Sequence, residues 1–149
     1  MEHQMNFITV GVNDLIAMKR WYQQKMGWMP VCESYDSVTF RLNRILLVLA
    51  QEDQLAENLS QWQDGSGFKR FVLTLGFQSE QEVDNAFVEL RQKSVSIIKK
   101  PVKDSSGNYK GYISDPEENY WELAFYPIGR TGKIELPGSI WQGKLFSKT

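Results

Sequence analysis

The chain has 149 residues, 42% of them hydrophobic and 23% charged, which is typical of one ordinary globular domain. Seventeen Lys and Arg against eighteen Asp and Glu give a net charge of −1 with no basic stripe, so we expect no nucleic-acid partner. The longest apolar run, residues 45–50, is too short to cross a bilayer, and the single cysteine, Cys32, cannot form an intramolecular disulfide, so we expect a soluble, cytoplasmic protein with no membrane partner.

The first half of the chain, about residues 5–50, has the pattern of a strand, a helix and three strands. Residues 7–12 are β-branched and apolar, and Asn13 and Asp14 supply helix-capping oxygens to the segment that follows. Apolar residues then recur at helical spacing, at Leu15, Met18, Trp21, Tyr22 and Met26. Three short strand-like runs come next, at 29–34, 37–41 and 45–50.

The second half, about residues 71–127, repeats this order after a polar linker at about 51–70 that has room for one short helix. A strand is predicted at 71–76, and Ser79 with Glu82 fits a capping box before a helix whose apolar face carries Val83, Phe87 and Leu90. Strands are predicted at 96–102, 109–114 and 120–126, the first of them at a sheet edge because Pro101 lacks a backbone donor.

The repeated order indicates an internal duplication. Asp14 and Ser79 occupy matching strand-to-helix corners about 65 residues apart. We therefore predict an α+β fold of two βαβββ modules, whose curved mixed sheets form a central cleft within a single domain of residues 1–149. Residues 128–149 form an apolar C-terminal extension, which we expect to pack on its own domain or on a partner subunit.

Three segments resemble a known family. Val12-Asn13-Asp14-Leu15, followed by Trp21-Tyr22 and Met26-Gly27-Trp28, is similar to the opening strand and helix of the vicinal oxygen chelate superfamily, which includes glyoxalases, bleomycin resistance proteins and extradiol dioxygenases. The run GYISDPEENYWEL at 111–123 resembles the closing hairpin of glyoxalase-like proteins, and GKIELP at 132–137 resembles a C-terminal extension found in some of them. The resemblance covers nearly the whole chain.

The resemblance implies a divalent metal held by side chains from the first and last strands of each half. Carried over, those positions fall on Phe7, on Val72 or a near neighbour, on Glu122, and on the strand at 45–50, which has no ligand-type side chain. Three of the four positions therefore lack a donor, and the only histidine, His3, lies about four residues before the expected position. We expect no metal site and no cofactor.

Glu122 is the one candidate catalytic residue. Strand alternation places it on the same face as Tyr120, and the resemblance implies that this face lines the cleft. A carboxylate there without a metal is either hydrogen-bonded by an Arg or Tyr, or has a raised pKa that would suit general acid or base catalysis. Both interpretations stay open at this point.

The candidate ligand-binding residues are Phe7, Thr9, Thr74, Tyr120 and Glu122. Thr9 and Thr74 share strand parity with the inferred cleft positions, although threonine is also simply a good strand former. Arg41 is either a partner of Glu122, a clamp for an anionic substrate, or a solvated side chain. At the turn before Tyr120, Glu118 stands where relatives usually have glycine, and we expect Asn119 to take the left-handed conformation.

The predicted function is metal-independent binding of a small organic ligand in the cleft. The alternative is a glyoxalase- or dioxygenase-type enzyme that uses a divalent metal, or Glu122 as acid or base. A third possibility is a cleft filled by side chains such as Phe7, with dimerisation as the main interaction. The resemblance implies a homodimer in any case.

Overall fold

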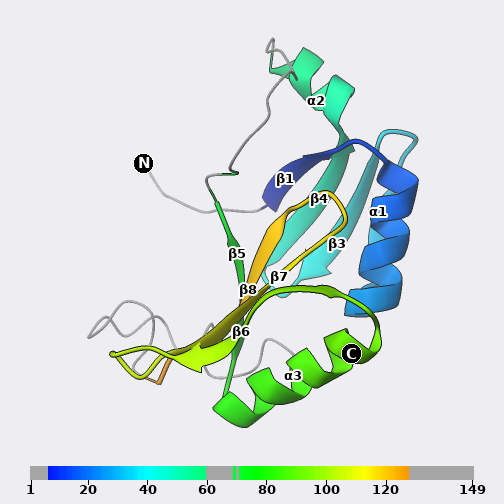
Figure 1. Ribbon diagram of the computed structural model, residues 1–149. Coiled ribbons are helices and arrows are strands. Elements are labelled where there is room, and N and C mark those ends of the chain that lie inside the picture. Colours follow the sequence, from blue (N-terminus) through cyan, green and yellow to red (C-terminus); the bar gives the residue numbers. More distant parts are fainter. Residues whose placement is uncertain (1–6, 60–68, 70, 128–149) are drawn as a thin grey trace, which may run out of the picture. The chain divides into compact units, whose positions relative to one another are not determined.

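A strand, a helix and three strands occur twice in the computed structural model, which describes residues 7–59, 69 and 71–127. The chain divides into unit 1, Met1–Phe68, and unit 2, Lys69–Thr149. In the described residues each unit has a four-stranded mixed sheet with one parallel and two antiparallel pairs (Figure 1). These sheets confirm the predicted α+β class with two βαβββ modules.

Unit 1 builds its sheet in the order β1-β4-β3-β2, with the first and last strands of the module parallel neighbours. The strands are β1 (Phe7–Val12), β2 (Pro30–Glu33), β3 (Ser37–Leu42) and β4 (Ile45–Gln51). The helices are α1 (Leu15–Trp21), the π-helical η1 (Tyr22–Met26) and α2 (Glu52–Asn58). As predicted, Asp14 caps α1, because its Oδ1 accepts a hydrogen bond of 2.9 Å from the Ala17 amide.

The core of unit 1 lies between α1 and its sheet. Met18 and Tyr22 are fully buried, and so are Phe40 of β3 and Leu49 of β4. The predicted first helix is present, but its last five residues are π-helical, and the helix ends at Gly27 with φ 71°. That left-handed conformation is open to glycine at no steric cost.

Unit 2 has the equivalent order β5-β8-β7-β6, with β6 at an edge as Pro101 predicts. The elements are β5 (Leu73–Phe77), α3 (Glu80–Gln92), β6 (Ser96–Lys103), β7 (Tyr109–Ser114) and β8 (Tyr120–Phe125). The predicted cap forms, since Ser79 Oγ accepts from the Glu82 amide at 3.1 Å. The Glu82 carboxylate accepts in turn from the backbone amide of Gln78 at 2.8 Å, so two hydrogen bonds stabilise the start of α3.

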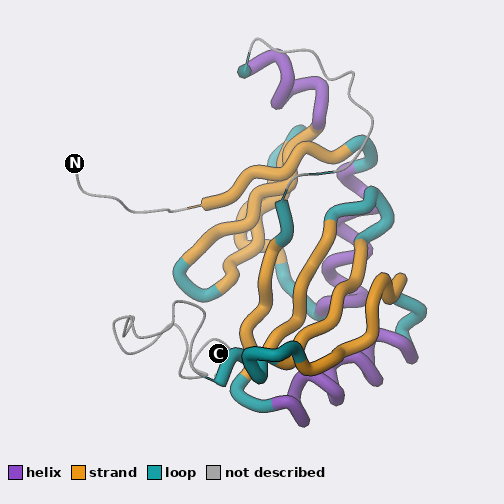
Figure 2. The backbone as a smooth tube through the Cα atoms, turned by 60° about the vertical axis from the view of Figure 1, so that its left-hand side comes forward, coloured by secondary structure: helices purple, strands orange, loops and turns teal. Residues whose placement is uncertain are grey.

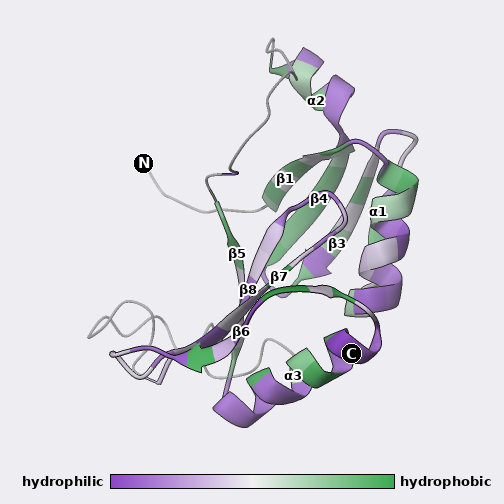
Figure 3. Ribbon diagram, viewed as in Figure 1, coloured by the Kyte–Doolittle hydropathy of each residue, from purple (hydrophilic) through white to green (hydrophobic). Residues whose placement is uncertain are grey.

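Helix α3 covers one face of the second sheet, as the tube in Figure 2 shows. Its buried residues are the predicted Val83, Phe87 and Leu90, while most of its other positions are hydrophilic in Figure 3. The short helix allowed in the linker is α2, which begins directly after β4. The C-terminal extension at 128–149 and His3 lie outside the described residues. That the two units form a single domain stays a prediction.

The turn between β7 and β8 differs from the sequence prediction. Glu118, not Asn119, has the left-handed conformation, with φ 60°. The reason is that Asn119 is buried and fixed: its amide and its Nδ2 donate to the two carboxylate oxygens of Asp115, at 2.8 and 2.7 Å, and its Oδ1 accepts from Lys69 at 2.9 Å. The positive φ therefore falls on the preceding residue.

Within the described ranges, none of the helices combines the length and the apolar character needed to cross a membrane.

Candidate functional site

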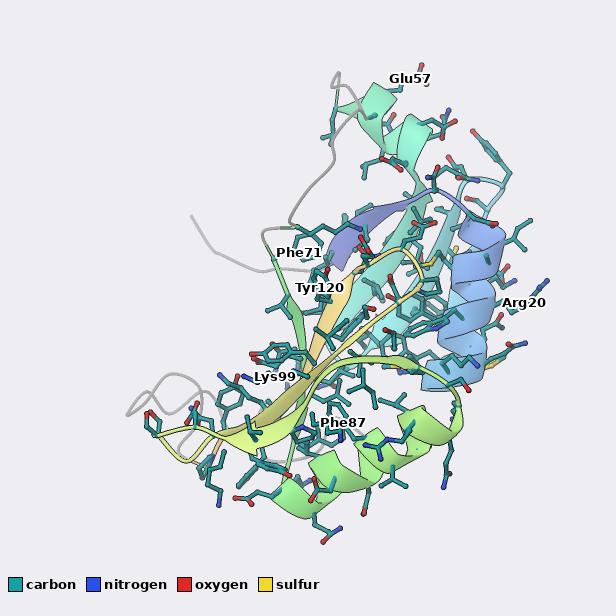
Figure 4. All side chains as sticks on the ribbon, viewed as in Figure 1. Arg20, Glu57, Phe71, Phe87, Lys99 and Tyr120 are labelled. Atoms are coloured by element: carbon teal, nitrogen blue, oxygen red, sulfur yellow. The ribbon has the colours of Figure 1, made fainter. Side chains whose placement is uncertain are left out.

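The second sheet has one apolar face and one polar face. Ile113, Trp121 and Leu123 are buried on the face that α3 covers. There the backbone approaches the helix closely, and a Cβ on Gly111 would lie 2.6 Å from Cζ of Phe87, which points from α3 toward the strands in Figure 4. Because side chains alternate along a strand, Glu122 projects from the opposite face.

Glu122 is at the centre of a cluster built from three neighbouring strands. In the sheet register, Thr74 of β5 and Tyr112 of β7 are its direct partners on either side. Thr74 Oγ1 donates to Oε1 at 3.1 Å, and Tyr112 Oη donates to Oε2 at 2.6 Å. Tyr126, which follows β8, donates from its Oη to Oε1 at 2.5 Å. We name Thr74, Tyr112, Glu122 and Tyr126 the hydroxyl–carboxylate cluster.

Lys110 lies beside this cluster on the same face of β7. Its Nζ is 4.0 Å from Oε2 of Glu122 and 3.7 Å from Oδ2 of Asp104. The same ammonium lies 5.8 Å from the centroid of the Tyr126 ring, within the range of a cation–π contact. Asp104 is ionised, because a hydrogen bond from the Asn108 side chain, above all, lowers the pKa of its carboxyl. The cluster is therefore flanked by one positive and one negative side chain.

The surroundings of Glu122 fix its charge. Its side chain is only 4% exposed, and this burial acts to raise the pKa. The hydrogen bonds from Tyr112, Tyr126 and Thr74, together with the charge of Lys110, outweigh burial and lower the pKa below its ordinary value. Glu122 is thus ionised at neutral pH. This direction contradicts the interpretation with a raised pKa, while the catalytic role of Glu122 stays a prediction.

Comparison with protein families places this geometry in context. The model of the Glyoxalase/Bleomycin resistance protein/Dioxygenase superfamily matches residues 4–123. The chain belongs to this superfamily. No curated protein matches the chain.

Several solved structures of the superfamily share the fold. A glyoxalase-related enzyme from Fulvimarina pelagi is 25% identical, with a TM-score of 0.76, and the match covers 91% of this chain and 99% of that one. A glyoxalase/bleomycin resistance protein/dioxygenase from Nocardioides is 17% identical, with a TM-score of 0.79 and 91% of both chains covered. Lactoylglutathione lyase from Agrobacterium tumefaciens is 18% identical, with a TM-score of 0.67 and coverage of 83% and 94%.

The residues that the structure describes do not fit the divalent metal that membership of this superfamily implies. In the described residues, no group of three or more His, Cys, Asp and Glu side chains lies close enough together to hold a metal ion. Comparison of the two sheets shows one missing ligand. In the second sheet Thr74 pairs with Glu122, whereas in the first sheet Thr9, at the position equivalent to Thr74, pairs with Val48, which cannot bind a metal. Glu122 is the one carboxylate at the predicted metal positions, and both of its oxygens already accept hydrogen bonds.

The structure brings two of the five candidate ligand-binding residues into contact, namely Thr74 and Glu122. Tyr120 lies on β8 two residues before Glu122 and pairs with Ser114 across the hairpin. Phe7 and Thr9 lie on β1 of unit 1, with Phe7 59% exposed. Arg41 is an exposed residue of β3. The ligand-binding roles of the five candidates stay predictions.

Sequence reasoning missed Tyr112, Tyr126 and Lys110 as parts of the site. A signal for Tyr112 was present, because residues 115–119 form a hairpin turn with Tyr120 opposite Ser114. Counting two residues outward from that pair puts Tyr112 opposite Glu122. Lys110 then follows, since it lies two residues before Tyr112 on the same face.

Proposed function

We propose that this member of the superfamily binds a small organic molecule and does so without a metal ion at Glu122. The observation that carries the proposal is the engagement of the Glu122 carboxylate by Thr74, Tyr112 and Tyr126. A metal ligand must offer lone pairs, and three of the about four lone-pair sites of this carboxylate already accept from hydroxyl groups. Glu122 then holds the two tyrosines and the threonine in place instead of coordinating an ion.

The chemistry of the polar face supports ligand binding. Ligand sites combine aromatic surface with a few fixed polar groups, and this face offers tyrosine rings, hydroxyls and an ammonium group. Their positions are fixed in advance by the hydroxyl–carboxylate cluster, which reduces the entropy lost on binding. We propose that Phe7, Thr9, Thr74 and Tyr120 contact the ligand and that Glu122 orients the hydroxyls.

Metal content and thermal stability test the proposal. The full chain, purified without chelators, is analysed for bound metals and then mixed with Mn²⁺, Ni²⁺, Fe²⁺ or Zn²⁺ while thermal unfolding is followed. We expect no stoichiometric bound metal, and we expect no added metal to raise the unfolding temperature in a way that depends on Glu122. A metal that stabilises the wild type and Glu89→Ala, but not Glu122→Ala, would overturn the metal-independent proposal; Glu89 is an exposed control on α3.

Ligand binding is tested separately with a library of planar organic compounds. We expect some of them to raise the unfolding temperature of the wild type in a saturable way, because a ligand that binds only the folded state stabilises it. A complete absence of stabilising compounds would count against the binding function.

A second candidate function is an enzyme of the glyoxalase or dioxygenase type. It is favoured by the glyoxalase-related enzyme from Fulvimarina pelagi, with which the chain shares 25% identity over 91% of its length. The lowered pKa of Glu122 makes this carboxylate a weak base, which speaks against acid–base catalysis there. Formation or breakdown of lactoylglutathione, assayed with and without the four metals, would support the enzyme; no reaction in either direction would leave the binding function as the better one.

We also propose a cytoplasmic homodimer. The cysteine content supports the compartment, and the resemblance supports the dimer. Light scattering at several protein concentrations measures the oligomeric state, and a strictly monomeric mass would contradict the dimer.

A further inference from the structure

The ammonium group of Lys110 lies near two carboxylates, but at long distances. Its two ion-pair contacts within residues 7–59, 69 and 71–127 measure 3.7 and 4.0 Å, both longer than a hydrogen bond. The side chain is 29% exposed, so the group is partly removed from water but still reachable. An ammonium has three N–H donors, and these contacts leave donors available for a further oxygen.

We propose that Lys110 is a specificity-determining residue that donates a hydrogen bond to an uncharged carbonyl oxygen of an aromatic ligand. The inference rests on the proposed binding function and names the class of ligand. Lys110 belongs to the same face as Glu122, as the 4.0 Å separation of Nζ and Oε2 demonstrates, so a group bound there meets the hydroxyl–carboxylate cluster.

The charges around Lys110 favour an uncharged acceptor. The carboxylates of Asp104 and Glu122 both lie within 4.0 Å of Nζ, so an incoming carboxylate would be placed close to two negative charges. A cationic group would meet the ammonium itself. A carbonyl oxygen accepts the hydrogen bond and avoids both repulsions.

The neighbouring rings favour an aromatic compound. Nζ lies over the ring of Tyr126, and Tyr112 is two residues further along the same face of β7. Both hydroxyls are anchored on Glu122, at 2.5 and 2.6 Å, which limits the motion of the rings. A carbonyl group at Lys110 would bring an attached planar ring against these tyrosines, where offset or edge contacts add to the affinity.

Three probes with the same ring test the proposal: benzamide, benzoate and benzylammonium. Their dissociation constants are measured by NMR titration of the isotope-labelled full chain, as wild type, Lys110→Met, Lys110→Gln and Lys103→Met. Lys103 is the matched control, because it lies on the same sheet but pairs with Glu80 of α3 on the opposite side. Thermal unfolding establishes that each variant is folded, and Lys110→Gln keeps an N–H donor should Lys110→Met fail to fold.

We expect benzamide to bind wild type and Lys103→Met equally, and several-fold more tightly than benzoate or benzylammonium. Lys110→Met should weaken benzamide binding about tenfold, the size of one hydrogen bond from a charged donor, and Lys110→Gln should weaken it less. Unchanged benzamide binding in Lys110→Met, or benzoate binding as tightly as benzamide, would overturn the role of Lys110. No binding of any probe would overturn the ligand class. The binding function itself fails only if the wider library also produces no stabilisation.

Discussion

Tyr112 donates a 2.6 Å hydrogen bond to Glu122 directly across the β7–β8 pair, so a tyrosine hydroxyl stands beside the carboxylate that the superfamily resemblance assigns to a metal. Hydrogen bonds to a charged acceptor are stronger than those between neutral groups. This pair therefore links the stability of the second sheet to the charge of Glu122.

Replacing Tyr112 with phenylalanine should destabilise the protein by about 1–3 kcal/mol, since a buried carboxylate loses one of its donors. The loss should also raise the pKa of Glu122, because the Tyr112 bond is the largest of the influences that lower it. Urea unfolding measures the stability change. Tyr35→Phe is the control, as this side chain is 88% exposed, and it should leave the stability unchanged. Equal stability of Tyr112→Phe and wild type would show that the bond contributes nothing.

The lowered pKa of Glu122 predicts a specific acid sensitivity. Its pKa is lower in the folded than in the unfolded state, so its stabilisation is complete above the unfolded value of about 4.3 and is lost as the pH falls through the folded value. Between about pH 5 and pH 3, wild type should lose more stability than Glu122→Gln, which cannot titrate there. Unfolding by urea at stepped pH values measures this difference. Glu89→Gln should behave like wild type, and parallel curves for all three proteins would contradict the assignment.

Gly111→Ala should destabilise unit 2 by about 1–3 kcal/mol, as overpacking usually does. The new Cβ would lie 2.6 Å from Cζ of Phe87 and 2.8 Å from both the carbonyl oxygen of Lys99 and the nitrogen of Pro101. Two of these atoms belong to the backbone, so trimming the helix side chain in Gly111→Ala/Phe87→Leu should restore only part of the loss. Gly11→Ala is a milder control, because its nearest neighbour is the flexible end of Leu55 at 3.2 Å. Thermal unfolding compares them, and equal effects of the two alanines would contradict the close approach of β7 and α3.

Tyr109 should ionise only at high pH, in a late step of a titration. Its hydroxyl donates to Asp84 of α3 at 2.7 Å, and this bond, followed by burial and the charge of Asp84, raises the pKa of Tyr109 to about 12. Asp84→Asn should lower that pKa, and Tyr109→Phe should remove the late step from an ultraviolet titration. A late step that persists in Tyr109→Phe would assign it to another residue.

Local signals in the sequence predicted most of the elements. Ser79 and Asp14 were identified as caps because their oxygens act within three residues of their own position, and both hydrogen bonds are present. The edge position of β6 followed from Pro101, which cannot donate to a neighbouring strand. These features depend on neighbours along the chain, so the sequence carries them directly.

The cluster around Glu122 was only partly predictable, because its members come from distant segments. Thr74 and Glu122 are 48 residues apart in the sequence and meet because β5 and β8 pair in parallel. No short turn joins these two strands, so the sequence does not reveal their register. Strand parity identified both residues as candidates but could not place them in contact. The direction of the Glu122 pKa depended on several hydroxyl donors acting together against burial, which no single position reveals. Asn119 shows the same limit, since one of the bonds that fix it comes from Lys69, 50 residues away.

The alternation along β8 also protects the protein against misfolding. A slip of this strand by one residue would carry Glu122 to the side where Phe87 and the rest of α3 pack, and would bring Trp121 and Leu123 among the hydroxyls of Thr74 and Tyr112. An ionised carboxylate without donors in that apolar layer would be far less stable than in its native place. Glu122 thus disfavours the nearest wrong alignment of the sheet, whatever molecule the native face binds.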